Sequence, residues 1–278
     1  MMEKFVKLPV FSARSLVRTC RLPAYIAFAA LFMVLFLFLT PPIYTGAGWG
    51  FLTRVPGLSG DYPLYLTRFL LSFVLLGVLP LCVALAWGDK PSALGLRFSA
   101  APLRWYHLAV FSVVAFLFGV SGAFSDGLYR YYPYSHSLVL DVLEKGWAAF
   151  LPHAFLYGFL YYLPWEFFFR GFLLLPMARE LEERAGDPRS EDRTAPGGSG
   201  SGGGFPALMA AIVAFQTIPS TLLHFGHPFA ELLSAIPAGL FFGWLAYRTR
   251  SIFPGLLLHF LVGMGTDITI IFLQRGTP

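Results

Sequence analysis

The chain has 278 residues, of which 56% are hydrophobic, 18% aromatic and only 13% charged, and its formal net charge is +5. The charged fraction is about half of the roughly 25% usual for soluble globular domains, and the mean hydropathy is +0.65. This composition excludes an ordinary soluble domain and predicts an all-α, polytopic membrane helix bundle.

Apolar stretches long enough to cross a bilayer occur along the whole chain, since a transmembrane helix needs about 20 residues. The sixth is short, and the fourth is long enough to be strongly tilted or partly interfacial. The sequence predicts about seven spans: Leu22–Thr40, Leu64–Trp87, Trp105–Phe124, Trp147–Leu175, Phe205–Leu223, Leu232–Tyr247 and Ile252–Phe272.

Basic side chains are concentrated in the N-terminal arm and in alternate connections, which is the positive-inside pattern. The N-terminus is therefore predicted to be cytoplasmic and, with an odd number of spans, the C-terminus to lie outside. The positive charge indicates topology and contact with the lipid bilayer, and no nucleic-acid partner is expected. The predicted cytoplasmic side carries Lys4, Lys7, Arg14, Arg18, Arg21, Lys90, Arg97, Arg104, Arg179, Arg184, Arg189, Arg193, Arg248 and Arg250, against Arg54, Arg130, Lys145 and Arg275 on the other side.

Two regions differ in their polar content. Residues 1–145 are predicted to form an N-terminal anchor and supporting helices, because the first apolar run has no small-x-small cleavage pattern and the early spans carry few polar side chains. Residues 146–278 are predicted to form the functional core, interrupted by a flexible cytoplasmic loop at 177–204 that is rich in Gly and Ser. Cys20 and Cys82 are isolated and indicate neither a disulfide nor a cysteine metal site.

The stretch "YYLPWEFFFRGFLLLP" places Glu166 and Arg170 inside an apolar helix. A charged side chain at the centre of a membrane helix costs about 2.5–3.5 kcal/mol on insertion scales, so such residues usually face a bundle interior or a wet cavity. The two residues are four apart and can pair on one helix face. They are either a buried packing ion pair or part of a site.

Histidines and carboxylates in the later spans favour a site. His224, His227 and Glu231 lie at the junction of the fifth and sixth spans, and His259 and Asp267 lie on one face of the seventh. A Glu and two His on three separate helices can converge. Such a set can supply a general base beside a water, and two imidazoles that bind a metal or stabilise an oxyanion.

The order of three motifs resembles the CPBP family, the intramembrane proteases of the CAAX prenyl protease 2 and bacterial Abi type. The motifs are "WEFFFRG", then His224 ahead of "FGHP", then "RTRSIFPGLLLH". The resemblance covers roughly 146–265 and implies an intramembrane endopeptidase in which a glutamate and a histidine activate water. It assigns Glu166, Arg170, His224 and His259 to family positions as the catalytic residues. His227, Glu231 and Asp267 are secondary candidates from their places in the later spans, not from the resemblance.

Three positions depart from the family pattern. Trp165 stands where the first Glu of a Glu-Glu-x-x-x-Arg motif is expected, Ser220 replaces a Phe, and Gly263 replaces an Asn or Asp. Either Glu166 acts as the base, or Glu231 or Asp267 substitutes for the missing carboxylate, or the site is inactive. Trp165 itself cannot carry a proton.

The sequence therefore predicts a multi-pass protease of a bacterial inner (plasma) membrane that cleaves a membrane-embedded or lipid-anchored protein or peptide. The first alternative is a catalytically inactive CPBP-like membrane protein acting in immunity or complex assembly. The second is a small proton-coupled transporter. Zinc is left open as a cofactor, with His224, His259 and Glu166 as its candidate ligands.

One geometric difficulty accompanies this prediction. A straight helix beginning at Phe205 would carry His224 about 28 Å from the cytoplasmic end, whereas Glu166 lies toward that end of its own span. The two side chains meet only if the fifth span begins outside the hydrocarbon or tilts strongly, or if the fourth span extends beyond it.

Overall fold

A computed structural model describes residues 13–40, 60–98, 104–186 and 204–275, without the side chains of 13–20, 184–186 and 204–206. All elements in these ranges are helical, so the prediction of an all-α bundle is confirmed. The α-helices are α1 (Ala13–Leu39), α2 (Tyr62–Ser72), α3 (Leu79–Ala86), α4 (Trp105–Gly122), α5 (Asp126–Tyr131), α6 (His136–Lys145), α7 (Phe150–Leu156), α8 (Leu163–Glu166), α9 (Leu175–Gly186), α10 (Gly204–Leu222), α11 (Phe229–Thr249) and α12 (Phe253–Arg275). Short 3₁₀ turns cover Pro91–Leu94 and Trp147–Ala149, and π-helical stretches cover Phe73–Val78, Tyr157–Tyr162 and Phe167–Leu174.

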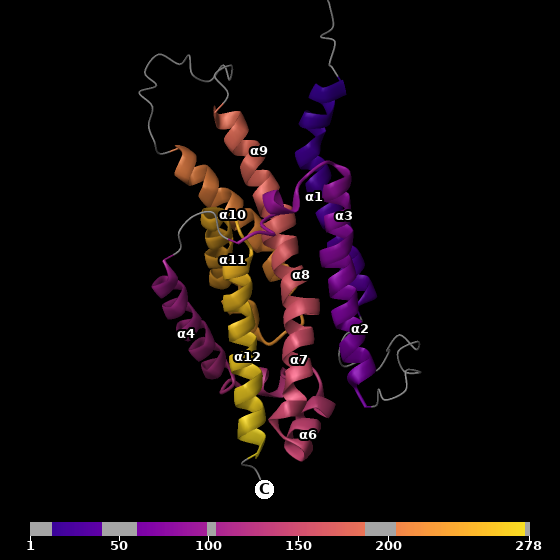
Figure 1. Ribbon diagram of the computed structural model, residues 1–278, viewed down its shortest axis with the longest axis vertical. Helices are drawn as coiled ribbons and strands as arrows, with labels where there is room; N and C mark the ends of the chain where they lie inside the picture. The colour runs from indigo at the N-terminus through magenta and orange to yellow at the C-terminus, as the bar shows by residue number, and fades with distance from the viewer. Residues whose placement is uncertain (1–12, 41–59, 99–103, 187–203, 276–278) are drawn as a thin grey trace, which may run out of the picture.

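Each predicted span corresponds to a helical run; the central helix and α12 follow the long axis of the molecule, whereas α4 and α10 are inclined to it (Figure 1). In the described residues, five runs are long and apolar enough to cross a membrane, and Ala207–Leu222 of α10 is a shorter apolar helix. The predicted fourth span, which carries Glu166 and Arg170, is not among the five. The protein is an integral membrane protein.

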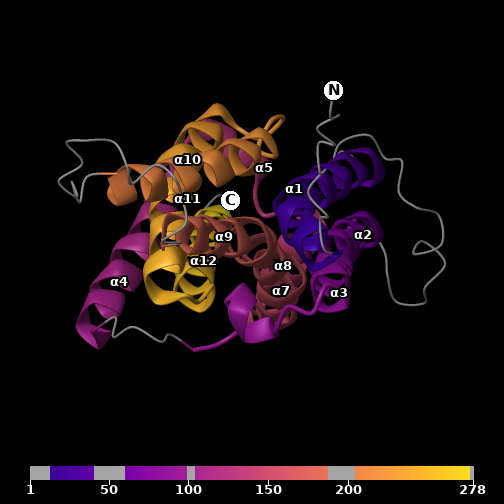
Figure 2. The same ribbon diagram turned by 90° about the horizontal axis from the view of Figure 1, so that it is seen from above.

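The central helix comprises α7, α8, α9 and the π-helical stretches between them. Every residue from Pro164 to Ala178 is buried, and the other helices surround this segment (Figure 2). A helix that is apolar on all faces is expected inside a bundle rather than at its edge. Glu166 and Arg170 are therefore surrounded by protein and do not face lipid.

Each π-helical stretch ends two residues before a proline, namely Pro80, Pro164 or Pro176. Proline has no N–H to give to the carbonyl four residues earlier, and its ring crowds that carbonyl. A shift to i→i+5 hydrogen bonds relieves the mismatch without ending the helix. Such bulges are frequent at functional sites, and two of the three flank Glu166.

One end of the bundle gathers several of the basic residues assigned to the cytoplasmic side. Asp89, which follows α3, accepts hydrogen bonds or ion pairs from Arg21 and Tyr25 of α1 and from Arg179 of α9. These contacts tie three segments together at the end where α9 and α10 approach the predicted loop (Figure 1). The cytoplasmic orientation of this end stays a prediction.

The predicted flexible loop at 177–204 is shorter than expected, which is a correction. Helix α9 continues to Gly186 and α10 begins at Gly204, so both ends of the predicted loop are helical. The sequence "ARELEERAG" explains the first extension, because it is rich in helix-forming residues and ends on a glycine. Residues 187–203 lie outside the described residues.

Helix α4 lies against α12 through glycines. A Cβ added at Gly119 would overlap the carbonyl oxygen of Val262, whereas one at Gly122 would meet only side-chain atoms, the Cδ1 methyl of Leu128 at 3.3 Å and Oγ1 of Thr266 at 3.7 Å. We expect Gly119→Ala to destabilise the protein by about 1–3 kcal/mol, because backbone must move to admit the methyl group. Gly122→Ala, on the same helix, should be close to neutral. Thermal unfolding in detergent measures both, and equal midpoints would contradict this packing.

Candidate active site

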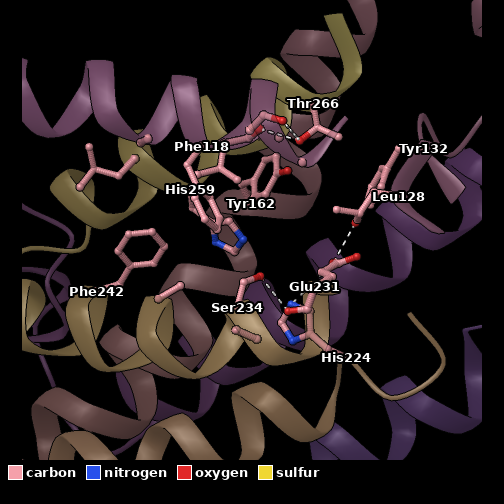
Figure 3. Close-up of a pocket in the computed structure, with 18 of the residues that line it drawn as sticks. Phe118, Leu128, Tyr132, Tyr162, His224, Glu231, Ser234, Phe242, His259 and Thr266 are labelled. Carbon is pink, nitrogen blue, oxygen red and sulfur yellow. Dashed lines mark hydrogen bonds and ion pairs between the residues drawn. The ribbon is translucent and has the colours of Figure 1, made fainter. Parts of the chain in front are cut away.

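A cavity of about 680 Å³ lies between the central helix, α4, α11 and α12, and it is lined mainly by aliphatic and aromatic side chains (Figure 3). Polar groups are few and come from separate helices, which is the usual composition of a ligand site. The polar and ionisable residues that line it are Ser121, Ser125, Tyr132, Tyr134, Tyr157, Tyr161, Tyr162, Trp165, His224, Glu231, Ser234, His259 and Thr266.

His224 lies in the turn that follows α10. Its Nδ1 is 2.8 Å from the carbonyl oxygen of Ser220. A carbonyl only accepts, so Nδ1 donates, and Nε2 of the neutral ring is left as an acceptor. The imidazole lies edge-on to the indole of Trp165, with ring centroids 5.2 Å apart. His224 is therefore level with the first motif, and the strong tilt of α10 (Figures 1 and 2) resolves the difficulty of depth.

The turn between α10 and α11 brings a carboxylate to His224. Gly226 has φ +91°, a conformation that few other residues adopt, and Pro228 precedes α11. The chain reverses there, and Glu231 in the first turn of α11 comes back beside the histidine. Its Oε1 is 3.9 Å from Nε2 of His224. Each of the two side chains remains partly exposed, at 18% for Glu231 and 11% for His224.

Two donors hold the carboxylate of Glu231. The hydroxyl of Tyr132 and Nδ1 of His227 each donate to Oε1 over 2.9 Å. Nε2 of His227 in turn accepts from Nη2 of Arg68 at 3.0 Å. These two hydrogen bonds fix the carboxylate of Glu231 in position beside His224.

Arg68 and Tyr132 were missed by sequence reasoning. Arg68 is buried on α2, with its guanidinium 4.8 Å from the ring centroid of Tyr134. It lies 159 positions before His227 in the chain. An arginine within an apolar run was a signal of function, but nothing in the sequence indicated its partner.

Glu166, His259 and Arg170 form a second cluster. Nδ1 of His259 is 2.7 Å from Oε1 of Glu166, and Nε of Arg170 is 3.4 Å from Oε2. Glu166 is fully buried and is not one of the residues that line the cavity, whereas His259 lines it. The carboxylate fixes the tautomer and orientation of the imidazole and leaves Nε2 available to the cavity.

Asp267, a secondary candidate, is separate from both clusters. It is fully buried and its Oδ2 is 2.9 Å from Nε2 of His153, whose Nδ1 is 2.5 Å from the hydroxyl of Tyr65. Asp267 does not line the cavity. The chain Asp267–His153–Tyr65 instead connects α12, α7 and α2, which is a packing arrangement.

We expect Asp267→Ala to lower the stability by about 1–3 kcal/mol, because it leaves His153 without its buried partner. Cleavage per folded molecule should persist. Thermal unfolding and peptide cleavage in vesicles, measured on the same preparation of the variant, test both expectations. Loss of cleavage with an unchanged unfolding midpoint would contradict the packing role and indicate that Asp267 takes part in catalysis.

The predicted zinc ligands are not assembled around one point. Glu166 meets His259 through Nδ1, whereas His224 is paired with Glu231. Within the residues that the structure describes, no three His, Cys, Asp or Glu side chains are placed to hold one metal ion. The side chains in this arrangement do not fit a tetrahedral zinc site.

A family model of Rce1-like proteins, described as type II CAAX prenyl endopeptidases, matches residues 147–264. This match confirms the resemblance inferred from the three motifs, and it covers the central helix, α10, α11 and the first half of α12. Comparison with curated proteins gave no match, and comparison with solved structures gave none either.

Proposed function

From the match of residues 147–264 to a protease family, we propose that the protein is an intramembrane endopeptidase in which His224 and Glu231 activate the attacking water. The single observation that carries the assignment is the pairing of these two residues at the cavity. Nε2 of His224 is a free acceptor 3.9 Å from the carboxylate, so one water can donate a hydrogen bond to each. In this proposal, Glu231 supplies the carboxylate that the family pattern has at the position occupied here by Trp165.

The reaction proceeds by general base catalysis. The water oxygen bonds to the carbonyl carbon of the scissile peptide, and one water proton passes to the His224–Glu231 pair. The tetrahedral intermediate then collapses. Its C–N bond breaks, and the proton held by the pair is delivered to the leaving amine nitrogen. The products are a carboxylic acid and an amine, and no other reactant is required.

His259 is proposed to stabilise the charge that develops on the carbonyl oxygen. Its Nδ1 is held by Glu166, so Nε2 faces the cavity, where the doubly protonated ring would donate a hydrogen bond to that oxygen. Such a preorganised donor in a site shielded from water strengthens as the oxyanion forms. Glu166 and Arg170 are thus positioning residues, because they act through His259.

The cavity wall supports a membrane-associated substrate. Its large apolar members include Phe111, Phe118, Phe241 and Phe242, and it lies within helices that span the bilayer. The proposed substrate is a membrane-embedded or lipid-anchored protein, which the wall would hold through apolar side chains or an attached lipid. The Rce1-like description adds prenylated C-terminal peptides as a specific class to test.

The test is cleavage by the purified full chain in phospholipid vesicles. Two internally quenched probes are offered, a peptide ending in a farnesylated CAAX sequence and an unprenylated peptide anchored by one transmembrane helix. His224→Ala should abolish cleavage, since it removes the acceptor for the water. His107→Ala, on α4 and outside the cavity lining, is the matched control and should keep wild-type rates.

Cleavage of either probe that depends on His224 supports the proposal and assigns the substrate class. Cleavage that survives His224→Ala contradicts it. Complete inactivity of the correctly folded wild type toward both probes would favour the inactive alternative, in which the cavity binds a membrane partner without hydrolysing it.

A further inference from the structure

Gly263 of α12 lies directly under a tyrosine hydroxyl. A Cβ added at this glycine would overlap Oη of Tyr162 and would lie only 2.7 Å from its Cζ. The hydroxyl therefore occupies the space into which a side chain at position 263 would project. The absence of a side chain on α12 is what admits the phenol from the central helix.

The central helix and α12 run antiparallel, and contacts between them recur every four residues along each helix. Tyr162 meets Gly263, and four residues later Glu166 meets His259, which is four residues earlier on α12. Residues four apart lie on one face of a helix. Tyr162 and Glu166 therefore lie on the face of the central helix that contacts α12. Of the two contacts with α12, that of Tyr162 is nearer to the end of the bundle where the C-terminus lies.

Tyr162 lines the cavity beside His259, with ring centroids 4.7 Å apart. Tyr157 packs on its ring, with centroids 4.4 Å apart. In Figure 3, Tyr162 and His259 lie on one side of the cavity and His224 with Glu231 on the other. A peptide carbonyl placed between them would have the water on one face and the phenol near its oxygen.

We propose that the hydroxyl of Tyr162 is a catalytic hydrogen-bond donor to the oxyanion, acting beside His259. This inference rests on the proposed function. A phenol is suited to the role because it is neutral, keeps its proton at physiological pH and requires no compensating charge in a buried site. The close contact over Gly263 fixes its position before substrate binds, which is the condition for electrostatic stabilisation.

The test is Tyr162→Phe in the vesicle assay. It removes one oxygen and keeps the ring that packs on Tyr157 and His259. We expect kcat to fall by about 10²-fold with little change in KM, because the donor acts mainly in the transition state. Affinity for a phosphinate analogue of the cleaved peptide should fall by a similar factor. Tyr62→Phe, which removes a phenol bonded to Asp141 outside the cavity, is the matched control and should change neither quantity.

A second test moves the hydrogen-bond donor from position 162 to position 263, and it applies even if Tyr162→Phe folds poorly. Tyr162→Leu frees the space over Gly263, and adding Gly263→Asn places an amide donor there. The double variant should recover at least tenfold of the kcat lost in Tyr162→Leu. An unchanged kcat in well-folded Tyr162→Phe, or no recovery in a folded double variant, overturns the inference.

The failure of this inference is distinguishable from failure of the proposed function. His224→Ala is measured in the same preparations. If it abolishes cleavage while Tyr162→Phe has no effect, the result supports activation of water by His224 and contradicts only the role proposed for Tyr162. If cleavage survives His224→Ala, the proposed function falls regardless of Tyr162.

Discussion

Glu231→Gln should lower the rate of peptide cleavage by about 10³-fold, within the range that general base catalysis supplies. The amide keeps the shape of the side chain and can still accept hydrogen bonds from Tyr132 and His227. It loses the negative charge that draws a proton from the water. The effect should therefore appear in kcat, with the unfolding midpoint changed far less.

Glu166→Gln is the matched comparison, since both changes replace a carboxylate by an amide. Glu166 is fully buried behind His259 and does not line the cavity. Its replacement should cost about 10–100-fold, as is typical of residues that orient a functional histidine. It should also destabilise the protein, because Arg170 loses its carboxylate partner. The reverse order of effects on the rate would make Glu166 the base.

Trp165→Glu should restore cleavage to the Glu231→Gln variant by at least tenfold, while lowering its thermal stability because a buried indole is lost. The ring of Trp165 lies 5.2 Å from that of His224, centroid to centroid, so a carboxylate at this position can reach the same imidazole. General base catalysis is worth about 10²–10⁴-fold, which leaves ample range for a measurable recovery.

The control for this rescue is Trp165→Gln in the same background, which creates the same space without the charge. Initial rates in vesicles, corrected for the folded fraction, compare the two double variants. If the glutamate variant is no faster than the glutamine variant, a carboxylate beside His224 is not what the site requires.

Much of the architecture was predictable because hydrophobicity and motif order are local properties of the chain. The apolar runs located most helix ends to within a few residues, although α1 begins earlier than predicted, at Ala13, and α9 continues to Gly186. The spacing of Glu166 and Arg170 predicted their ion pair. The same local reading placed His224 and His259 in motifs, and the cavity contains both. The motifs did not indicate which carboxylate each histidine would contact.

The partners depend on three-dimensional features that one sequence does not display. Glu231 reaches His224 because the chain reverses at Gly226, and a separation of seven residues across a turn does not determine which side chains face each other. Arg68 reaches His227 from the other half of the chain. The predicted division at residue 145 therefore falls between two side chains that are in contact.

The π-helical stretches and the glycine contact were also beyond sequence reasoning. The predicted fourth span already ran through Pro164, but periodicity alone does not show that the hydrogen-bond pattern changes to π-helical just before this proline. Gly263 was interpreted only as a missing polar residue. The structure shows the hydroxyl of Tyr162 in the space that this glycine leaves open.

The central claim is that His224 and Glu231 act on water as one unit, and a double-mutant cycle on cleavage in vesicles tests it most directly. The variants are His224→Ala, Glu231→Gln and their combination, all with the same probe peptide. Residues that work as a unit are strongly non-additive, so the double variant should be no slower than the slower single variant, within about threefold. A double variant whose loss equals the product of the two single losses would show independent action and contradict the account.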